Sequence, residues 1–502
     1  SGGNYNVLIG DEAGTAITTG DGNVAIGFQA LDAAETSSDN VAIGHLSSSA
    51  ITTGTQNVSV GAYSLRVDDV GSKSTAIGYQ ALAQQNYATA TDSNNTAVGY
   101  NSGQAITTGT KNNFIGGLSG DAITEGSQNV ALGTETLSSD TLGSRSVAIG
   151  QGALFAQNFT TATNAFNTAV GYEAGVSITT GTVNTLIGGD AGKSLTVGHH
   201  NTAVGIDAME NNINGSNSVA IGSFALQDQT FSTATDANNV AVGYAAGANI
   251  TSGISNTIIG SSAGDALTDA DFNVAIGLGS LGADTRGSKS VAVGTACLQA
   301  QNFTTATDTH NTAVGHNAGN DVTTGVSNTL IGSEAGDALT DADFNIAIGH
   351  EALSADTQGS NSVAVGMGAL FNQNFTTATT VYNTAVGHAA GNQITTAVQN
   401  TIMGGLAGDA LTTGGENVAI GVLALSTEDT GRKNVAVGTQ ALMVQNSDVD
   451  NYNTAVGYLT GKAITSGVRN TLVGAVAGDN LTDADFNVAI GYDALGSDTK
   501  GS

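Results

Sequence analysis

The chain has 502 residues, of which 70 are glycine, none is proline or tryptophan, and 11% are charged. Its 12 basic and 42 acidic residues give a net charge of −30, which argues against nucleic acid or anionic lipid as a partner because like charges repel. The single cysteine, Cys297, leaves no disulfide framework or cysteine-based zinc site, and the absence of a run of about 18 apolar residues predicts no membrane insertion.

From its first residues the chain repeats the motif Asn-(Val/Thr)-Ala-(Ile/Val)-Gly, and the final glycine of the motif marks a register that continues to Gly491. Successive motif glycines are 17 residues apart, except that the step lengthens to 21 between Gly78 and Gly99 and at every fourth step after it. The last long step, from Gly438 to Gly457, is two residues shorter. Three short steps and one long step make a superrepeat of 72 residues.

Each copy is too small to be a domain, so it buries its apolar face by stacking on its neighbours. In a typical copy, Asn167–Gly171 has the length and β-branched content of a strand ended by glycine, and Ser177–Thr180 predicts a second strand ended by Gly181. Two strands and two turns leave no room for a helix. We therefore predict an all-β fold, a parallel β-solenoid (β-roll) of 17-residue coils with 21-residue coils at every fourth step, continuous over residues 1–502.

In such a stack the asparagine at the head of each strand, such as Asn167, Asn184 and Asn201, falls on one line along the solenoid. Stacked asparagines can form a ladder of hydrogen bonds, as in other in-register parallel stacks. Alternatively, each asparagine is present because it tolerates a turn conformation. Both explanations can hold together.

Side chains alternate along a strand, and we expect the first and third residues of Val-Ala-Ile to point into the coil and the middle one outward. The middle residue is alanine in most copies and larger in others, so this face is apolar and should pack against another surface. Identical chains around a three-fold axis are the simplest supplier of that surface. The predicted inter-chain packing residues are Leu186, Ile258, Leu330, Ile402 and Leu472.

The long coils are the best candidate contact surface, because they repeat one aromatic and several hydroxyl side chains on one face. Aromatic faces beside hydroxyl groups suit binding to a glycan or a protein receptor. In the alternative, the phenylalanines fold back over the local core or pack between chains. The candidate contact residues are Phe159, Thr160, Thr161, Phe303, Thr304, Thr305, Phe375, Thr376 and Thr377.

A second recurring group consists of three aspartates in one turn. Calcium is a hard cation that prefers several oxygen ligands, so these turns are candidate Ca²⁺ sites. Their spacing matches no known calcium loop, and a solvated acidic turn is the alternative; we expect no other cofactor. The candidate calcium residues are Asp265, Asp269 and Asp271, then Asp337, Asp341 and Asp343, and finally Asp479, Asp483 and Asp485.

The units Asn95–Gly109 and Asn167–Gly181, and the cores Ser146–Gly150 and Ser218–Gly222, carry a family resemblance. Their Asn-Thr-Ala-Val-Gly and Ser-Val-Ala-Ile-Gly patterns resemble the repeat regions of phage tail fibres and the β-roll heads of trimeric autotransporter adhesins. The resemblance covers essentially the whole chain. It implies a left-handed coil, a homotrimer, and a location that is extracellular, on a cell surface or on a virion.

These observations favour a non-enzymatic fibre that displays a receptor-binding surface toward a cell-surface glycan or protein receptor. No nucleophile elbow, phosphate loop or unique pair of placed carboxylates is present, so we expect no enzymatic activity. The alternative is a self-assembling extracellular filament or matrix protein whose chains stack head to tail. A minor alternative is binding to ice or to a polysaccharide lattice through the threonine-rich turns.

Overall fold

The computed structural model describes residues 3–500, which fall into two units divided between Ile254 and Ser255. Both units are all-β: the described residues form strands, turns, bends and irregular segments, without a helix. No segment of this part of the chain is therefore a helix that is long and apolar enough to cross a membrane.

Each coil contributes one three-residue strand. In the described part of the first unit these main strands are β1 (Val7–Ile9), β2 (Val24–Ile26), β3 (Val41–Ile43), β4 (Val58–Val60), β6 (Thr75–Ile77), β8 (Thr96–Val98), β9 (Asn113–Ile115), β10 (Val130–Leu132), β12 (Val147–Ile149), β14 (Thr168–Val170), β15 (Thr185–Ile187), β16 (Thr202–Val204), β18 (Val219–Ile221) and β20 (Val240–Val242). β14 confirms the strand that was predicted at Asn167–Gly171.

The second unit repeats this pattern. Over its described residues the main strands are β21 (Thr257–Ile259), β22 (Val274–Ile276), β24 (Val291–Val293), β26 (Thr312–Val314), β27 (Thr329–Ile331), β28 (Ile346–Ile348), β30 (Val363–Val365), β32 (Thr384–Val386), β33 (Thr401–Met403), β34 (Val418–Ile420), β35 (Val435–Val437), β36 (Thr454–Val456), β37 (Thr471–Val473) and β38 (Val488–Ile490).

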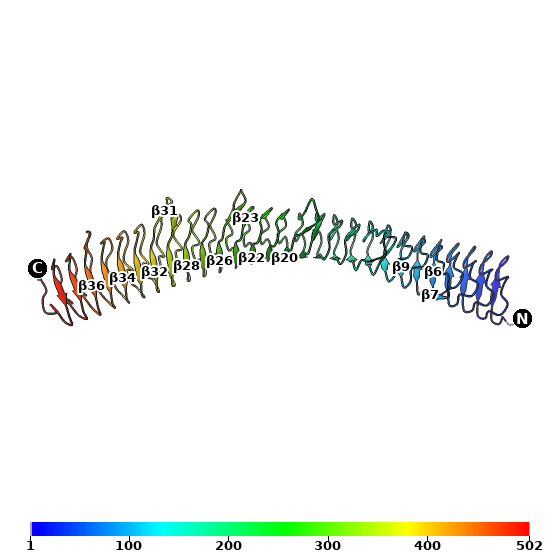
Figure 1. Cartoon of the computed structure of the whole chain (residues 1–502), viewed down its shortest axis with the longest axis horizontal. Coiled ribbons are helices and arrows are strands. Elements are labelled where there is room, and N and C mark those ends of the chain that lie inside the picture. The colour runs from blue at the N-terminus through cyan, green and yellow to red at the C-terminus, as the bar shows by residue number, and fades with distance from the viewer. Residues whose placement is uncertain (1–2, 501–502) are drawn as a thin grey trace. The chain divides into compact units, whose positions relative to one another are not determined.

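Neighbouring main strands pair in parallel with identical positions opposite one another. Val147, Ala148 and Ile149 of β12, for example, pair with Thr168, Ala169 and Val170 of β14. Figure 1 shows the coils following one another in chain order within each unit. Because the extra residues of the long coils lie outside the main strands, they do not disturb this register. The parallel β-solenoid with a 17-residue coil is confirmed.

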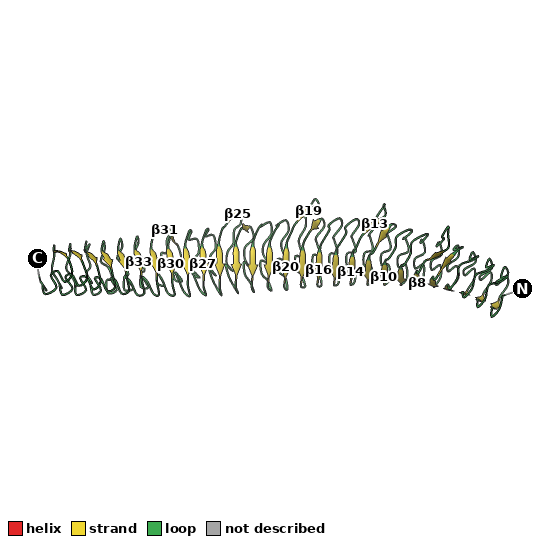
Figure 2. Ribbon diagram, turned by 60° about the horizontal axis from the view of Figure 1, so that its bottom comes forward, coloured by secondary structure: helices red, strands yellow, loops and turns green. Residues whose placement is uncertain are grey.

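Two-residue strands occur only where the long coils stack on the coil before them, among the described residues. They pair as β5 (Gly71–Ser72) with β7 (Thr91–Asp92), β11 (Gly143–Ser144) with β13 (Thr163–Asn164), β17 (Gly215–Ser216) with β19 (Thr235–Asp236), β23 (Gly287–Ser288) with β25 (Thr307–Asp308), and β29 (Gly359–Ser360) with β31 (Thr379–Thr380). In Figure 2, β13 and β19 lie on the side of their coils away from the main strands.

The second strand predicted at Ser177–Thr180 is wrong, because this segment forms a turn and a bend. Its backbone still bonds to the next coil: the Ser177 amide donates to the Lys193 carbonyl at 3.2 Å, and the Thr179 amide donates to the Thr196 carbonyl at 3.0 Å. The segment therefore stacks in register without adopting extended strand geometry.

The core contains the second residue of the main strands, which we call the middle column, together with buried turn residues such as Leu154 and Ile178. The predicted direction of alternation is wrong: the middle residues point into the coil, and the first and third residues point outward. The predicted inter-chain packing residues are consequently inside their own chain, each 0% exposed: Leu186, Ile258, Leu330, Ile402 and Leu472.

Large middle residues fit because glycine leaves room for them at the turn. A Cβ atom added to Gly175, in the preceding coil, would lie 2.7 Å from a methyl group of Leu186, and one added to Gly192 would lie 2.8 Å from the other methyl group. In the next long coil the arrangement is reversed, since a buried Leu226 occupies this turn position and the middle residue is Ala220. The core is thus filled from the strand side or from the turn side by complementary sizes.

The motif glycines form a second column, in which backbone packs directly on backbone. Their φ angles lie between +121° for Gly150 and +148° for Gly171, a region that side chains disfavour. A Cβ atom at Gly116 would lie 2.2 Å from the carbonyl oxygen of Gly133 in the next coil. The motif therefore requires glycine at this position for both conformation and space.

The asparagines form a buried hydrogen-bonded column. Asn184 is 0% exposed; its Oδ1 accepts the backbone amide of Asn201 at 3.0 Å, and its Nδ2 donates to the Gly198 carbonyl at 3.0 Å. A longer contact of 3.3 Å joins Asn184 Nδ2 to Asn167 Oδ1. The predicted ladder is present, and each asparagine mainly satisfies backbone groups of the neighbouring coil.

Candidate functional site

The long-coil loops separate the candidate contact residues into buried and exposed sets. Phe159, Phe303 and Phe375 are only 5%, 7% and 8% exposed, as the alternative prediction of a folded-back ring requires. The six threonines are exposed, namely Thr160, Thr161, Thr304, Thr305, Thr376 and Thr377. Any contact made by these loops would therefore use hydroxyl groups rather than the phenylalanine faces.

The aspartate turns do not bring their three carboxylates together. Asp343 Oδ1 accepts the Val326 amide at 2.8 Å, and Asp485 Oδ1 accepts the Val468 amide at 2.7 Å, so the third aspartate closes a contact with the preceding coil. The second aspartate of the first turn, Asp269, lies 3.4 Å from Arg286 Nε. Among residues 3–500, none of the candidate triplets places three ligand atoms within 4.8 Å of one another.

Buried acidic residues that the sequence did not reveal recur where a long coil follows a short one. Asp140 is 0% exposed; its Oδ1 accepts the amides of Gly143 at 3.0 Å and Phe159 at 3.2 Å, and its Oδ2 accepts Gln157 Nε2 at 2.6 Å. Gln157 Oε1 in turn accepts Asn167 Nδ2 at 2.8 Å. We call Asp140 and Gln157 with these hydrogen bonds the bracket. It connects the Phe159 loop to the asparagine column.

The same bracket occurs at Asp68, Asp284 and Asp356, and in each of them, as at Asp140, burial raises the pKa of the aspartate while hydrogen bonds oppose the rise. The equivalent residue of the third superrepeat is Asn212, and that of the sixth is Glu428. Because an uncharged amide is accepted at the position, the bracket is a structural connection between coils rather than an acid–base site.

The outward face of the main strands carries the first and third strand residues, which we call the outer columns. They are valine, threonine, isoleucine and other uncharged residues, without a charged side chain in any main strand of residues 3–500. Several of the third residues are well exposed, among them Ile187 at 39% and Ile221 at 41%. The face therefore has an apolar column, formed by the third strand residues and not by the middle ones that the sequence predicted, beside a first-residue column in which valine and threonine are both common.

Aromatic rings that lie one or two positions after the motif glycines contact one another from coil to coil in the first unit. Phe28 and His45 are stacked with ring centroids 5.4 Å apart, His45 contacts Tyr63 edge-on at 5.1 Å, and Tyr79 and Tyr100 are stacked at 5.7 Å. In each stacked pair, one face of each ring is covered by its partner.

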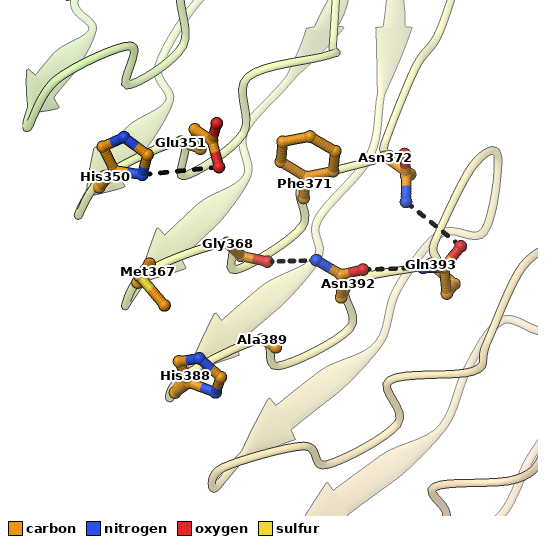
Figure 3. Close-up of a pocket in the computed structure, with 10 residues that line it drawn as sticks. All are labelled: His350, Glu351, Met367, Gly368, Phe371, Asn372, His388, Ala389, Asn392 and Gln393. Carbon is orange, nitrogen blue, oxygen red and sulfur yellow. Dashed lines mark hydrogen bonds and ion pairs between the residues drawn. The ribbon is translucent and has the colours of Figure 1, made fainter.

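A shallow hollow of about 370 Å³ is lined by the turns that follow β28, β30 and β32 of the second unit. Figure 3 shows its amide rim: Asn392 Nδ2 donates to the Gly368 carbonyl at 3.1 Å, and Asn372 Nδ2 donates to Gln393 Oε1 at 3.3 Å. The titratable groups among its lining residues are His350, Glu351 and His388.

Next to this hollow, Glu334, His350 and Glu351 place one potential ligand atom each within 4.8 Å of one another, the one such group of three in the described part of the chain. His350 Nδ1 lies 3.5 Å from Glu351 Oε2. Burial raises the pKa of the nearby Asp337 to about 6, and repulsion from Glu334, Asp321 and Glu351 contributes to the rise. The sequence did not predict this group, because its members belong to two coils.

No protein-family model matches the chain, and no curated protein shows significant similarity to it. The resemblance to tail-fibre repeats and adhesin heads therefore rests on the repeated motif and on the solenoid that the structure shows.

Proposed function

We propose that the chain is a non-enzymatic structural and adhesive fibre segment that associates laterally with copies of itself, as a homotrimer, and displays its long-coil loops to a receptor. The observation that carries the proposal is the uncharged, β-branched outer face, which continues along the described strands of each unit. The face of a sheet that is exposed to water normally carries polar and charged side chains.

The size of this face supports association. Fourteen strands at about 4.8 Å per step give a length of roughly 60 Å per unit. With a width of about 10 Å for the two outer columns, each unit presents an uncharged face on the order of 600 Å², comparable in size with the largest surface patches of ordinary monomers, and its third-residue column is apolar throughout. Contact with a second apolar surface would remove it from water.

Charge is divided between the two borders of the face. The residue five positions before each motif glycine forms a column, which we call the ridge column, that holds six of the twelve basic residues, namely Lys73, Lys111, Arg145, Lys289, Lys433 and Arg469. The residue two positions after each motif glycine forms an acidic column with Glu12, Glu135, Glu173, Asp190, Asp207, Glu334, Glu351 and Asp493. In a cyclic assembly of parallel chains, unlike borders of neighbouring chains meet. Basic and acidic columns would then face each other.

The test is the mass of the purified chain in solution across a dilution series, by sedimentation equilibrium or native mass spectrometry. The proposal predicts an assembly of three chains of 49.5 kDa each. The double variant Ile187→Lys/Ile221→Lys places two cations on the outer face and should shift the mass toward one chain, because an unpaired charge is costly to bury.

The matched control is Thr108→Lys/Thr180→Lys, which adds the same charge at exposed turn positions away from the outer face. It should assemble like the natural chain, and circular dichroism should show that both variants keep their β structure. A natural chain that remains single at every concentration would sink the proposal.

The alternatives give different results in the same measurement. A head-to-tail filament would appear as polymers of undefined length rather than as a discrete assembly. Lattice binding through the threonine-rich turns has less support, because hydroxyl groups in these turns donate hydrogen bonds to the neighbouring coil. Thr107 donates to the Thr124 carbonyl at 3.2 Å, and Thr323 donates to the Thr340 carbonyl at 3.1 Å.

A further inference from the structure

Glu334, His350 and Glu351 form a surface group with the composition of a metal site. The three side chains come from two adjacent coils, those of β27 and β28, and Glu334 and Glu351 occupy the same position of their coils. Glu334 and Glu351 are half-buried and His350 is exposed, so the group is open to an ion from solution.

Hydrogen bonds between coils hold the backbone of this group in place. The Glu334 amide donates to the His316 carbonyl at 2.9 Å, the Glu351 amide to the Ser333 carbonyl at 3.0 Å, and the Gly368 amide to the His350 carbonyl at 3.0 Å. The two coils are therefore held in fixed register, with the three ligand atoms within 4.8 Å of one another.

The chain contains its own comparison, two superrepeats earlier. The equivalents of Glu334, His350 and Glu351 are Asp190, Ile206 and Asp207, and the equivalent of Asp337 is Lys193. Lys193 Nζ lies 3.3 Å from Asp190 and 3.1 Å from Glu173, and its charge opposes the rise that burial causes in the pKa of Asp207. In that superrepeat a built-in ammonium neutralises the carboxylates.

In the later superrepeat the ammonium is replaced by another carboxylate. Asp337 interacts with the charges of Glu334 and Glu351, and its Oδ1 is buried without a hydrogen-bond partner among the described residues. At the position of Ile206 in the earlier superrepeat, the later one has His350, which supplies an imidazole nitrogen. The later superrepeat therefore has four potential ligands, Glu334, His350, Glu351 and Asp337, and carries a carboxylate where the earlier one has the ammonium of Lys193.

We propose that Glu334, His350 and Glu351 bind a divalent transition-metal ion such as Zn²⁺, with the carboxylate of Asp337 adding negative charge beside it. One imidazole nitrogen with carboxylate oxygens suits Zn²⁺ and its neighbours in the first transition row, whereas Ca²⁺ prefers six to eight oxygens. Water would complete the coordination. The inference does not depend on the proposed assembly, because all four residues belong to one chain.

Two variants use residues that the chain already carries at the equivalent position, so the fold should accept them. Asp337→Lys restores the ammonium of Lys193, and His350→Ile restores the side chain of Ile206. Zn²⁺ binding to the full chain is measured by isothermal titration calorimetry, and Co²⁺ binding by its visible absorption, which changes when nitrogen and carboxylate replace water. We expect one ion per chain, and at least about tenfold weaker binding in each variant.

The control is His388→Gln, since glutamine already follows the motif glycine at Gln151. It lies outside the ligand group and should bind Zn²⁺ like the natural chain. Equal binding by the natural chain and by both test variants would overturn the proposal, as would Ca²⁺ binding that matches Zn²⁺ in affinity. Circular dichroism of each variant excludes loss of fold as the cause.

Discussion

The glycine column shows how strongly a single position can be constrained in this chain. Gly116 and Gly117 are neighbours in the sequence, yet a Cβ atom at Gly116 meets a backbone oxygen at 2.2 Å, whereas one at Gly117 meets nothing within 4 Å. Gly116 also has a φ of +140°. The first glycine is required by geometry and the second is not.

We therefore predict that Gly116→Ala destabilises the chain by at least about 1 kcal/mol, because the alanine cannot adopt the native φ without moving the next coil. Gly117→Ala is the matched control and should leave stability within about 0.5 kcal/mol of the natural chain. Urea unfolding followed by circular dichroism measures both. Equal stability of the two variants would contradict the packing described for the glycine column.

At the scale of elements, neighbouring coils are joined by side chains that satisfy backbone groups, and the Asp140–Gln157 bracket is the most demanding of these connections. It places a carboxylate in the core with neutral donors and no cation among its partners. Burial raises the pKa of Asp140, so the folded chain binds the proton more tightly than the unfolded chain does. The charged form therefore weakens folding above the unfolded pKa, and the penalty is relieved as pH falls.

Asp140→Asn tests this sign, since Asn212 already occupies the equivalent position. We expect the variant to match or exceed the natural chain in stability at pH 7, and we expect its advantage to be smaller at pH 4, because a falling pH favours the protonated form of Asp140. Thermal unfolding at the two pH values measures the difference. A variant that is less stable than the natural chain at pH 7 would show that the hydrogen bonds to the carboxylate outweigh its desolvation.

Within each unit the coils form a linear array in which each coil contacts its neighbours, and the sequence repeats its phase every 72 residues. Stability in such an array is approximately a sum of coil and neighbour terms. Deletion of residues 167–238 removes one superrepeat and joins Phe166 to Asn239, which keeps every column in register. We predict that this shortened chain folds and melts within a few degrees of the natural chain.

The control deletion, residues 167–230, removes eight residues fewer and joins Phe166 to Phe231 out of phase. It should lose stability around the junction, because the asparagine and glycine columns are interrupted there. Circular dichroism and thermal unfolding distinguish the two shortened chains. Similar melting of both shortened chains would contradict the requirement for register.

The period, the parallel register and the asparagine ladder could be predicted because each follows from a spacing in the sequence. The direction in which the strand side chains alternate could not be predicted, because valine and isoleucine flank a small alanine and both faces of the strand are apolar in the sequence. The overlooked signal was the pairing of Leu186 with Gly192 in one copy and of Ala220 with Leu226 in another, which only an inward-facing middle column explains.

Predictions about the sites failed where partners lie a full coil apart. Asp140 and Gln157 are 17 residues apart and look like isolated surface residues in a single repeat, although both are buried. Glu334 and Glu351 have the same separation. Comparison of superrepeats in register, as for Lys193 and Asp337, identifies such positions, because it shows which charge replaces which.

The hydrogen bonds that join one coil to the next run along the direction of stacking, which gives each unit a specific response to mechanical force. Tension applied to the two ends of a unit loads these bonds in series, so the weakest coil opens first and the others remain closed. A 17-residue coil that is pulled straight releases about 50 Å of chain beyond the roughly 4.8 Å that it occupied. Under tension, such a unit would lengthen in successive discrete steps and would dissipate mechanical energy coil by coil, without unfolding all at once.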